Sequence, residues 1–197
     1  MQQKLIAEAF GTFTLAVAVL CSLHMGSSII PTPVVAGLTL GLFVYTIGGK
    51  SGCHINPAVT LGLWSINKIK TNDAVKYIIA QLVGGFLAFA LASAILGAKK
   101  IGMTPESMPD FLAEALGAIV FGFGIAAVVM GKIKDDIVGL VIGGSLLLGI
   151  IIAAGFGSMG ILNPAVALAL GVVNLSYVLG AIVGTMLGMN LYRKLMS

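Results

Sequence analysis

Long apolar stretches recur along the whole chain, separated by short polar or charged segments. Six of them are long enough to cross, or nearly cross, the ~30 Å hydrocarbon layer of a membrane as helices. They comprise residues 5–23, 34–48, 75–96, 111–130, 137–154 and 175–192. The second stretch is short, and its helix is expected to begin near Pro31. The pattern predicts six transmembrane helices.

Two further apolar segments, 57–66 and 164–173, are too short to cross. About ten residues give only ~15 Å of helix, half the thickness of the hydrocarbon layer. Segments of this length suit helices that enter the membrane and return on the same side. The sequence therefore predicts an all-α membrane protein with six transmembrane helices and two re-entrant half-helices.

Composition supports a membrane protein and argues against several other classes. Hydrophobic residues make up 58% of the chain and charged residues 9%, whereas about 25% charged residues is usual for soluble domains. The net charge is +4, but the Lys and Arg residues are scattered along the chain and aromatic residues are few. This distribution does not suit nucleic-acid binding. The two Cys and two His residues fit neither a disulfide framework nor a metal site. No cofactor or metal is expected.

The basic residues predict the orientation in the membrane, because cytoplasmic loops carry an excess of Lys and Arg. With a cytoplasmic amino terminus and a re-entrant first half-helix, nine of them fall on the cytoplasmic side and two outside. The nine are Lys4, Lys50, Lys68, Lys70, Lys76, Lys132, Lys134, Arg193 and Lys194, and the two are Lys99 and Lys100. We expect a multi-pass protein of the cell membrane, inner or plasma, with both termini cytoplasmic.

The chain also contains an internal duplication. The segment "AEAFGT" returns as "AEALGA" 106 residues later, and Asn-Pro-Ala occurs twice, 107 residues apart. Each copy holds three spans and one half-helix, and an odd number of spans inserts the second copy upside down. We expect one channel domain over residues 1–197, built from inverted repeats of about 1–100 and 105–197.

The two Asn-Pro-Ala triplets, Asn56-Pro57-Ala58 and Asn163-Pro164-Ala165, each precede a predicted half-helix. Asn is a favoured helix N-cap and Pro a favoured first helical residue, so each half-helix should begin at its triplet. If the tips meet at mid-membrane, two helix-dipole ends and two amides converge and repel cations. The Gly-rich segments before the triplets can expose backbone carbonyl groups within the membrane only if these groups line a water-filled cavity. The exposed carbonyl groups and the donors of the two triplets then form a path for a small neutral solute.

These motifs resemble the major intrinsic protein family, the aquaporins and glycerol facilitators. The resemblance is carried, in the family's order, by "AEAFGT", "SGCHINPAVTLG", "AQLVGG", "AEALGA" and "LNPAVALALG", which span nearly the whole chain. It implies a right-handed six-helix bundle, one pore per subunit and a homotetramer in the lipid bilayer. It also implies passive permeation of water and small neutral solutes, with no enzymatic activity.

The resemblance assigns roles to three polar residues of the spans and loops. Glu8 and Glu114 match residues that brace the loops before the half-helices, and His54 resembles another loop-bracing residue. A buried charge in a span is costly, which invites a functional interpretation such as a proton relay or direct contact with the solute. We favour the bracing role for both Glu residues.

The selectivity filter is expected to depart from the family pattern. Val166 stands where the family usually has Arg, and spacing from the triplets assigns Ala36, Ile151 and Gly160 to the other filter positions. A one-residue gap would change the assignment of Ile151. Such a filter is wide and apolar, and we expect its widening to outweigh its tendency to dewet. Cys53, equivalent to Gly160 in the first repeat, is expected either to face the pore or to pack against a neighbouring helix.

The sequence leaves the solute open. A facilitator for glycerol, urea, ammonia or undissociated metalloid acids is an alternative to a water channel, although Ala167 replaces the Asp common in glycerol facilitators. A coupled secondary transporter also uses inverted repeats and broken helices, but it would need a titratable site at mid-membrane. A closed relative with a vestigial pore remains another alternative. An enzyme is disfavoured, because Ser158 has no plausible His or Asp partner.

Overall fold

The computed structural model describes residues 1–25, 30–97 and 105–196. Within them lie six long helices and two short ones, with no strand in the described ranges. The long helices are α1 (Gln2–His24), α2 (Thr32–Ser51), α4 (Thr71–Leu96), α5 (Met108–Val129), α6 (Val138–Gly155) and α8 (Leu175–Met196). The short helices are α3 (Pro57–Ser65) and α7 (Pro164–Leu170), and a 3-10 turn, η1 (Asp135–Ile137), precedes α6. All six long helices, α6 together with η1, are long and apolar enough to cross a membrane, which confirms the predicted fold class.

Glycines explain two of the helix ends that differ from the prediction. α2 continues past residue 48 to Ser51, where Gly52 adopts a left-handed φ of 88° and caps the helix. α7 ends at Leu170 rather than at residue 173, because Gly171 has a φ of 71°. Glycine takes this conformation without the penalty that a Cβ atom imposes, so it stops a helix readily.

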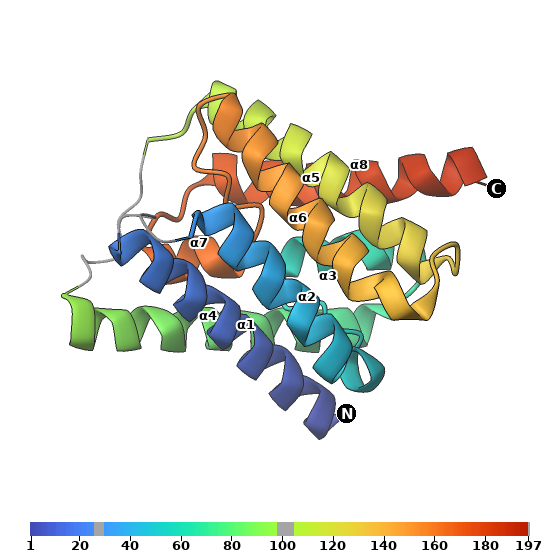
Figure 1. Cartoon of the computed structure of the whole chain (residues 1–197), viewed down its shortest axis with the longest axis horizontal. Helices are drawn as coiled ribbons and strands as arrows, with labels where there is room; N and C mark the ends of the chain where they lie inside the picture. Colours follow the sequence, from blue (N-terminus) through green and yellow to red (C-terminus); the bar gives the residue numbers. More distant parts are fainter. Residues whose placement is uncertain (26–29, 98–104, 197) are drawn as a thin grey trace.

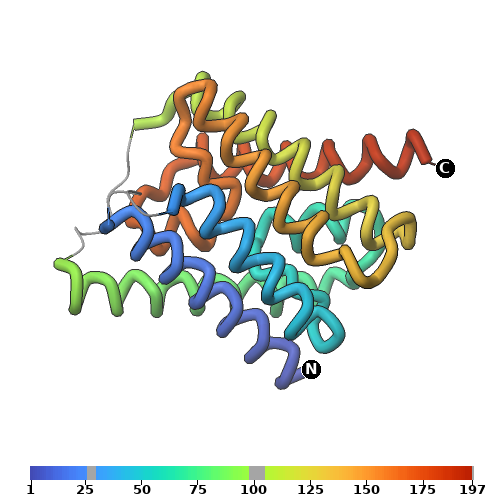
Figure 2. Tube along the Cα trace, in the orientation of Figure 1, coloured from blue at the N-terminus to red at the C-terminus, as the bar shows by residue number. Residues whose placement is uncertain are grey.

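The two halves of the chain run in opposite directions through the bundle. In Figure 1, α1 and α5 run antiparallel to one another, as do α2 and α6, and α4 and α8. The short helices α3 and α7 lie inside the bundle, and both chain termini lie toward the same end (Figures 1 and 2). This arrangement agrees with an inverted repeat.

Equivalent helix contacts recur in the two halves. A Cβ atom added at Gly84 of α4 would clash with the carbonyl oxygen of Ala9 in α1. In the second half, a Cβ atom at Gly184 of α8 would clash in the same way with the carbonyl oxygen of Ala115 in α5. Small residues let membrane helices approach until their backbones touch. Each half therefore packs its first helix against its last span through a glycine.

A glycine pair joins the two halves to one another. Gly37 of α2 and Gly143 of α6 are 106 residues apart, the offset between the two "AE" motifs. A Cβ atom at Gly37 would lie 2.7 Å from the Gly143 carbonyl oxygen, and one at Gly143 would clash with the Gly37 carbonyl oxygen. Equivalent positions of the two repeats thus meet each other, as they must beside a pseudo-two-fold axis.

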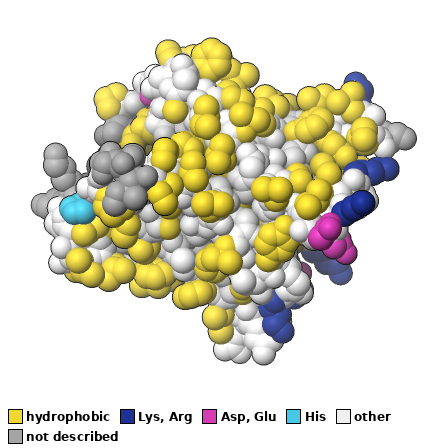
Figure 3. Space-filling view, in the orientation of Figure 1, with side chains coloured by type: hydrophobic (Ala, Val, Ile, Leu, Met, Phe, Trp, Pro, Cys, Tyr) yellow, Lys and Arg dark blue, Asp and Glu magenta, His cyan; other side chains and the backbone are white. Residues whose placement is uncertain are grey.

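The basic side chains of the described residues gather at one end of the molecule. Figure 3 shows Lys and Arg clustered at the end that carries both termini, while apolar side chains are spread over the rest of the visible face. Lys99 and Lys100, which the sequence places on the opposite side, lie outside the described residues.

Candidate functional site: the meeting point of the half-helices

Each short helix begins at the Asn of its Asn-Pro-Ala triplet. Asn56 is extended, with φ −161°, and its Oδ1 accepts a hydrogen bond from the Ala58 N–H at 2.8 Å. Asn163 is also extended, with φ −149°. Its Oδ1 accepts from the Ala165 and Val166 N–H groups at 3.0 and 3.4 Å. The predicted N-cap arrangement is confirmed, and it fixes the orientation of each side-chain amide.

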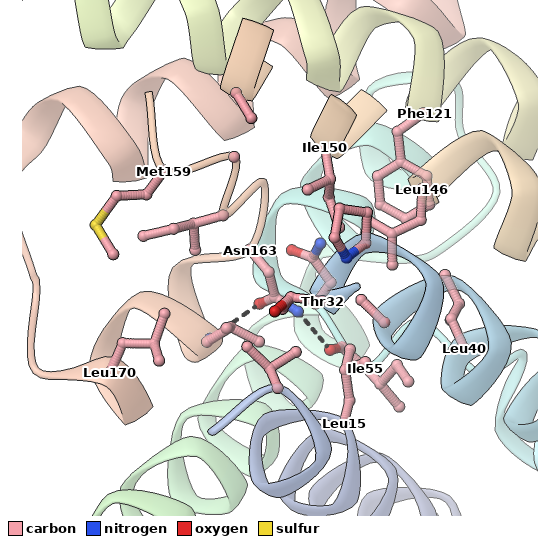
Figure 4. A pocket seen from close by; sticks show the side chains of 18 of the residues that line it. Leu15, Thr32, Leu40, Ile55, Phe121, Leu146, Ile150, Met159, Asn163 and Leu170 are labelled. Atoms are coloured by element: carbon pink, nitrogen blue, oxygen red, sulfur yellow. Dashed lines mark hydrogen bonds between the residues drawn. The ribbon is translucent and has the colours of Figure 1, made fainter. Parts of the chain in front are cut away.

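The tips of α3 and α7 touch through reciprocal hydrogen bonds. Asn56 Nδ2 donates to the Leu162 carbonyl oxygen at 2.9 Å, and Asn163 Nδ2 donates to the Ile55 carbonyl oxygen at 3.1 Å. Figure 4 shows the second of these bonds at the centre of the cavity described below. A primary amide nitrogen carries two hydrogens, so each Asn keeps a second donor after this contact.

The residue before each Asn has a backbone conformation that its side chain disfavours. Ile55 has φ 37° and Leu162 has φ 52°, and two residues earlier Cys53 and Gly160 have φ 50° and 66°. A positive φ is unusual for leucine and strongly unfavourable for β-branched isoleucine. Such residues cost about 1–3 kcal/mol each and persist only where surrounding bonds hold them.

Glu8 supplies those bonds in the first half of the chain. Its Oε1 accepts from the Ser51 hydroxyl at 2.7 Å and the His54 N–H at 2.9 Å. Its Oε2 accepts from the Ile55 N–H at 2.7 Å and from Gln81 Nε2 at 2.8 Å. The side chain has no solvent exposure, yet both oxygens are fully used. This carboxylate therefore holds the strained loop against α1 and α4.

Glu114 occupies the equivalent place in the second half. Its Oε1 accepts from the Ser158 hydroxyl at 2.5 Å and the Ile161 N–H at 3.0 Å, and its Oε2 accepts from the Leu162 N–H at 2.7 Å. The position equivalent to Gln81 is Ala181, which offers no amide. Glu8 and Glu114 therefore accept similar hydrogen bonds from the loop backbone, but only Glu8 also accepts one from a side chain of the last span in its half.

His54 lies in the loop before α3 and contacts one residue of α3 and one of α4. Its Nδ1 lies 3.2 Å from the Thr60 hydroxyl, and its ring packs against Tyr77 with centroids 4.9 Å apart. The Tyr77 hydroxyl donates to the Ser51 carbonyl oxygen at 2.9 Å. These contacts join the loop to α3 and α4.

An apolar cavity of about 180 Å³ leads to the paired Asn residues. Its polar side chains are Thr32, His54, Asn56 and Asn163, and the rest of its described wall is apolar. Figure 4 shows Met159 and Leu170 toward one end and Leu40, Leu146 and Phe121 toward the other, with Asn163 between them. Met159 is half exposed, so the cavity opens at the end away from the termini.

The structure corrects one of the four expected filter positions. Ala36, Gly160 and Val166 all line this cavity, together with Ile150. Ile151 is 49% exposed on the outer face of α6, whereas Ile150 is 7% exposed. Neighbouring residues of a helix point about 100° apart, so a one-residue error in spacing moves a side chain from the pore to the outside. The assignment of Ile151 is wrong, and Ile150 takes its place in the wall.

A second, smaller cavity of about 30 Å³ lies toward the end that carries the termini. Cys53 lines it and is 4% exposed. It shares Leu40, His54 and Phe121 with the larger cavity. The two cavities therefore meet at these three side chains.

Several residues of this site were not identified from the sequence. Ser51 and Ser158, which donate to the two Glu residues, are 107 residues apart, the same offset as the two triplets. This shared offset could have identified both Ser residues as equivalent parts of the two loops. Gln81 and Thr60, hydrogen-bonded to each other at 2.9 Å, have no polar counterpart in the second repeat.

Comparison with known proteins agrees with this geometry. The family model described as Major intrinsic protein matches residues 1–192. The chain is 37% identical to Aquaporin AqpM of Methanothermobacter marburgensis over 66% of its own length, and that match spans 56% of the relative. It is 30% identical to a probable NIP-type aquaporin of Nicotiana alata, over 99% of the chain and 78% of the relative.

The fold also has a counterpart among solved structures. It matches the aquaglyceroporin from Plasmodium falciparum with a TM-score of 0.69 and 21% sequence identity, over 97% of this chain and 93% of that one. Identity at this level supports the fold alone. With the family match over nearly the whole length and the paired Asn-Pro-Ala tips, the conclusion is that this chain belongs to the major intrinsic protein family.

Proposed function

We propose that the protein is a passive transmembrane channel for water and small uncharged solutes, and not an enzyme. The observation that carries the proposal is the pair of Asn amides in a cavity whose wall is mostly apolar. Each amide oxygen is bound by its own half-helix and one amide hydrogen by the opposite loop. The second hydrogen of each amide remains for a solute in the cavity that both side chains line. A solute that accepts hydrogen bonds gains a partner there.

The same geometry disfavours cations. Because the capping bonds occupy both Oδ1 atoms, Asn56 and Asn163 present N–H donors to the cavity, and a cation needs oxygen ligands. The N-terminal ends of α3 and α7 add partial positive charge at the same point. We therefore propose that ion exclusion resides at the paired triplets.

We further propose that Ala36, Ile150, Gly160 and Val166 form the outer filter. None of these side chains carries a charge or a hydrogen-bonding group, so the filter discriminates by size and by the cost of dehydration. A small-solute facilitator with little preference for water is the second candidate. The observation that favours it is the 180 Å³ cavity, which exceeds an engineered ~150 Å³ cavity able to hold benzene.

A coupled transporter has less support. Coupling to protons or ions needs a titratable or ion-binding group in the solute path. Of the residues that line the larger cavity, His54 alone is titratable, and its ring is held by Thr60 and Tyr77. Both Glu carboxylates are buried and engaged with loop backbone.

The membrane context is likewise a proposal. The basic end of the molecule (Figure 3) suits the cytoplasmic side of a cell membrane, which would place both termini in the cytoplasm. We propose a single channel domain over residues 1–197, with inverted repeats of about 1–100 and 105–197, assembled as a homotetramer in the bilayer.

Stopped-flow light scattering on reconstituted liposomes tests the function. Under an osmotic gradient, vesicles with the protein should shrink faster than empty vesicles and be insensitive to proton or sodium gradients. Separate gradients of glycerol and urea distinguish a water channel from a general facilitator. Water and solute flux no faster than in empty vesicles would refute the channel, and flux that requires an ion gradient would establish the transporter.

A further inference from the structure

The path through the protein narrows on the side of the paired Asn residues that faces the termini. The larger cavity is about 180 Å³ and the smaller one about 30 Å³, which is room for about one or two water molecules. Leu40, His54 and Phe121 belong to both walls. Phe121 and Leu40 are each 2% exposed, so the two cavities are joined through closely packed side chains.

Residues at equivalent positions of the two repeats explain why the two cavities differ in size. Positions 106 residues apart place Phe121 opposite Leu15 and Ile142 opposite Ala36, and the 107-residue offset of the triplets places Cys53 opposite Gly160. Leu15, Ala36 and Gly160 line the larger cavity only, Ile142 and Cys53 line the smaller one only, and Phe121 lines both where they meet.

At each of these three pairs the inner residue is the larger. Phe replaces Leu, Ile replaces Ala, and Cys replaces Gly. Because closely packed interiors leave few voids larger than a water molecule, the added side-chain atoms occupy space that remains open at the outer end. At these three positions the smaller cavity has larger side chains than the larger cavity, whereas Val129, equivalent to Leu23, is the smaller of its pair.

We propose that the size limit of this channel is set by this inner ring, Phe121, Ile142 and Cys53 with Leu40 and His54, and not by the outer filter. The inference rests on the proposed channel function. At the ring, His54 is the one charged or hydrogen-bonding side chain apart from the weakly polar Cys53 thiol, so a permeating molecule has few polar partners. Water can pass by bonding to other waters in file, whereas a wider solute with several hydroxyl groups must give up more hydrogen bonds at once.

The test enlarges the ring by giving it the residues of the outer end. Phe121→Leu and Ile142→Ala introduce the residues found at the equivalent positions of the first repeat. Ile142→Val provides a milder change should the alanine variant fail to fold. Two lipid-side positions provide matched controls: Phe86→Leu on α4 and Leu148→Ala on α6, which are 53% and 48% exposed. All variants are purified, checked for a monodisperse elution profile and reconstituted at equal protein-to-lipid ratio.

Water and glycerol permeabilities are then measured for each variant. The wild type should favour water, and the ring variants should raise glycerol permeability by about tenfold, the effect of lowering one barrier by ~1.4 kcal/mol, with a smaller change for water. The controls should match the wild type. Wild-type glycerol flux comparable to water flux, or ring variants with unchanged glycerol flux, would overturn the inference while leaving the channel intact. Absence of wild-type water flux would instead overturn the proposed function.

Discussion

The carboxylate of Glu8 should stabilise the first re-entrant loop far more than its neutral isostere can. In Glu8→Gln, the amide nitrogen must replace either the oxygen that faces the Ser51 hydroxyl and His54 N–H or the one that faces the Ile55 N–H and Gln81. The hydroxyl and the Gln81 amide can rotate to accept, but a backbone N–H cannot. Either orientation therefore leaves one buried backbone donor without an acceptor, which costs about 1–3 kcal/mol.

Labelling of Cys53 measures this cost directly. The thiol is buried on the same loop, and Cys21 is exposed, so a Cys21→Ser background leaves a single thiol whose reaction with a maleimide requires the loop to open. A cost of 1–3 kcal/mol should raise the labelling rate about 5- to 150-fold in Glu8→Gln. Glu114→Gln is the matched control, because that carboxylate holds the other loop. Equal rates in Glu8→Gln and the parent, or equal acceleration by Glu114→Gln, would refute the reasoning.

Three further predictions test other parts of the structure. Gly84→Ala should lower thermal stability in detergent by an amount worth about 1–3 kcal/mol, because its Cβ meets the backbone of α1. Gly144→Ala, which has nothing within 4 Å of its added Cβ, should be neutral or stabilising, and a reversed order would contradict the close helix contact. Asn163→Asp replaces an amide donor with an acceptor and should admit cations, detected as faster dissipation of a sodium gradient in liposomes; an unchanged leak would place ion exclusion elsewhere. Val166→Arg should reduce glycerol flux through the outer cavity in the Phe121→Leu background, where the inner ring is enlarged, and unaltered flux there would show that this position lies outside the path.

The fold followed from features that the chain displays locally. Span length and apolar composition located the long helices, and Asn followed by Pro located the start of both short ones, because capping depends on neighbouring residues. The inverted arrangement followed from counting spans between the repeated motifs. None of these steps required knowledge of which helices touch.

Details of the site depended on geometry that is not local. The wall residue is Ile150 and not Ile151, which depends on how α6 is rotated within the bundle, and a count of residues from the triplet does not fix that rotation. Gln81 escaped notice because its counterpart, Ala181, is apolar. The narrowing at Phe121 arises from side-chain volumes contributed by separate helices, which a linear pattern does not reveal.

The unequal cavities also bear on how the protein could be blocked. A compound that fills the 180 Å³ chamber but exceeds the 30 Å³ one would arrive from the side opposite the termini, lodge against Phe121 and stop there. The same compound offered from the other side would never reach the chamber. Solutes would permeate in either direction according to their gradient, whereas such a compound would inhibit the channel only when added on the side opposite the termini.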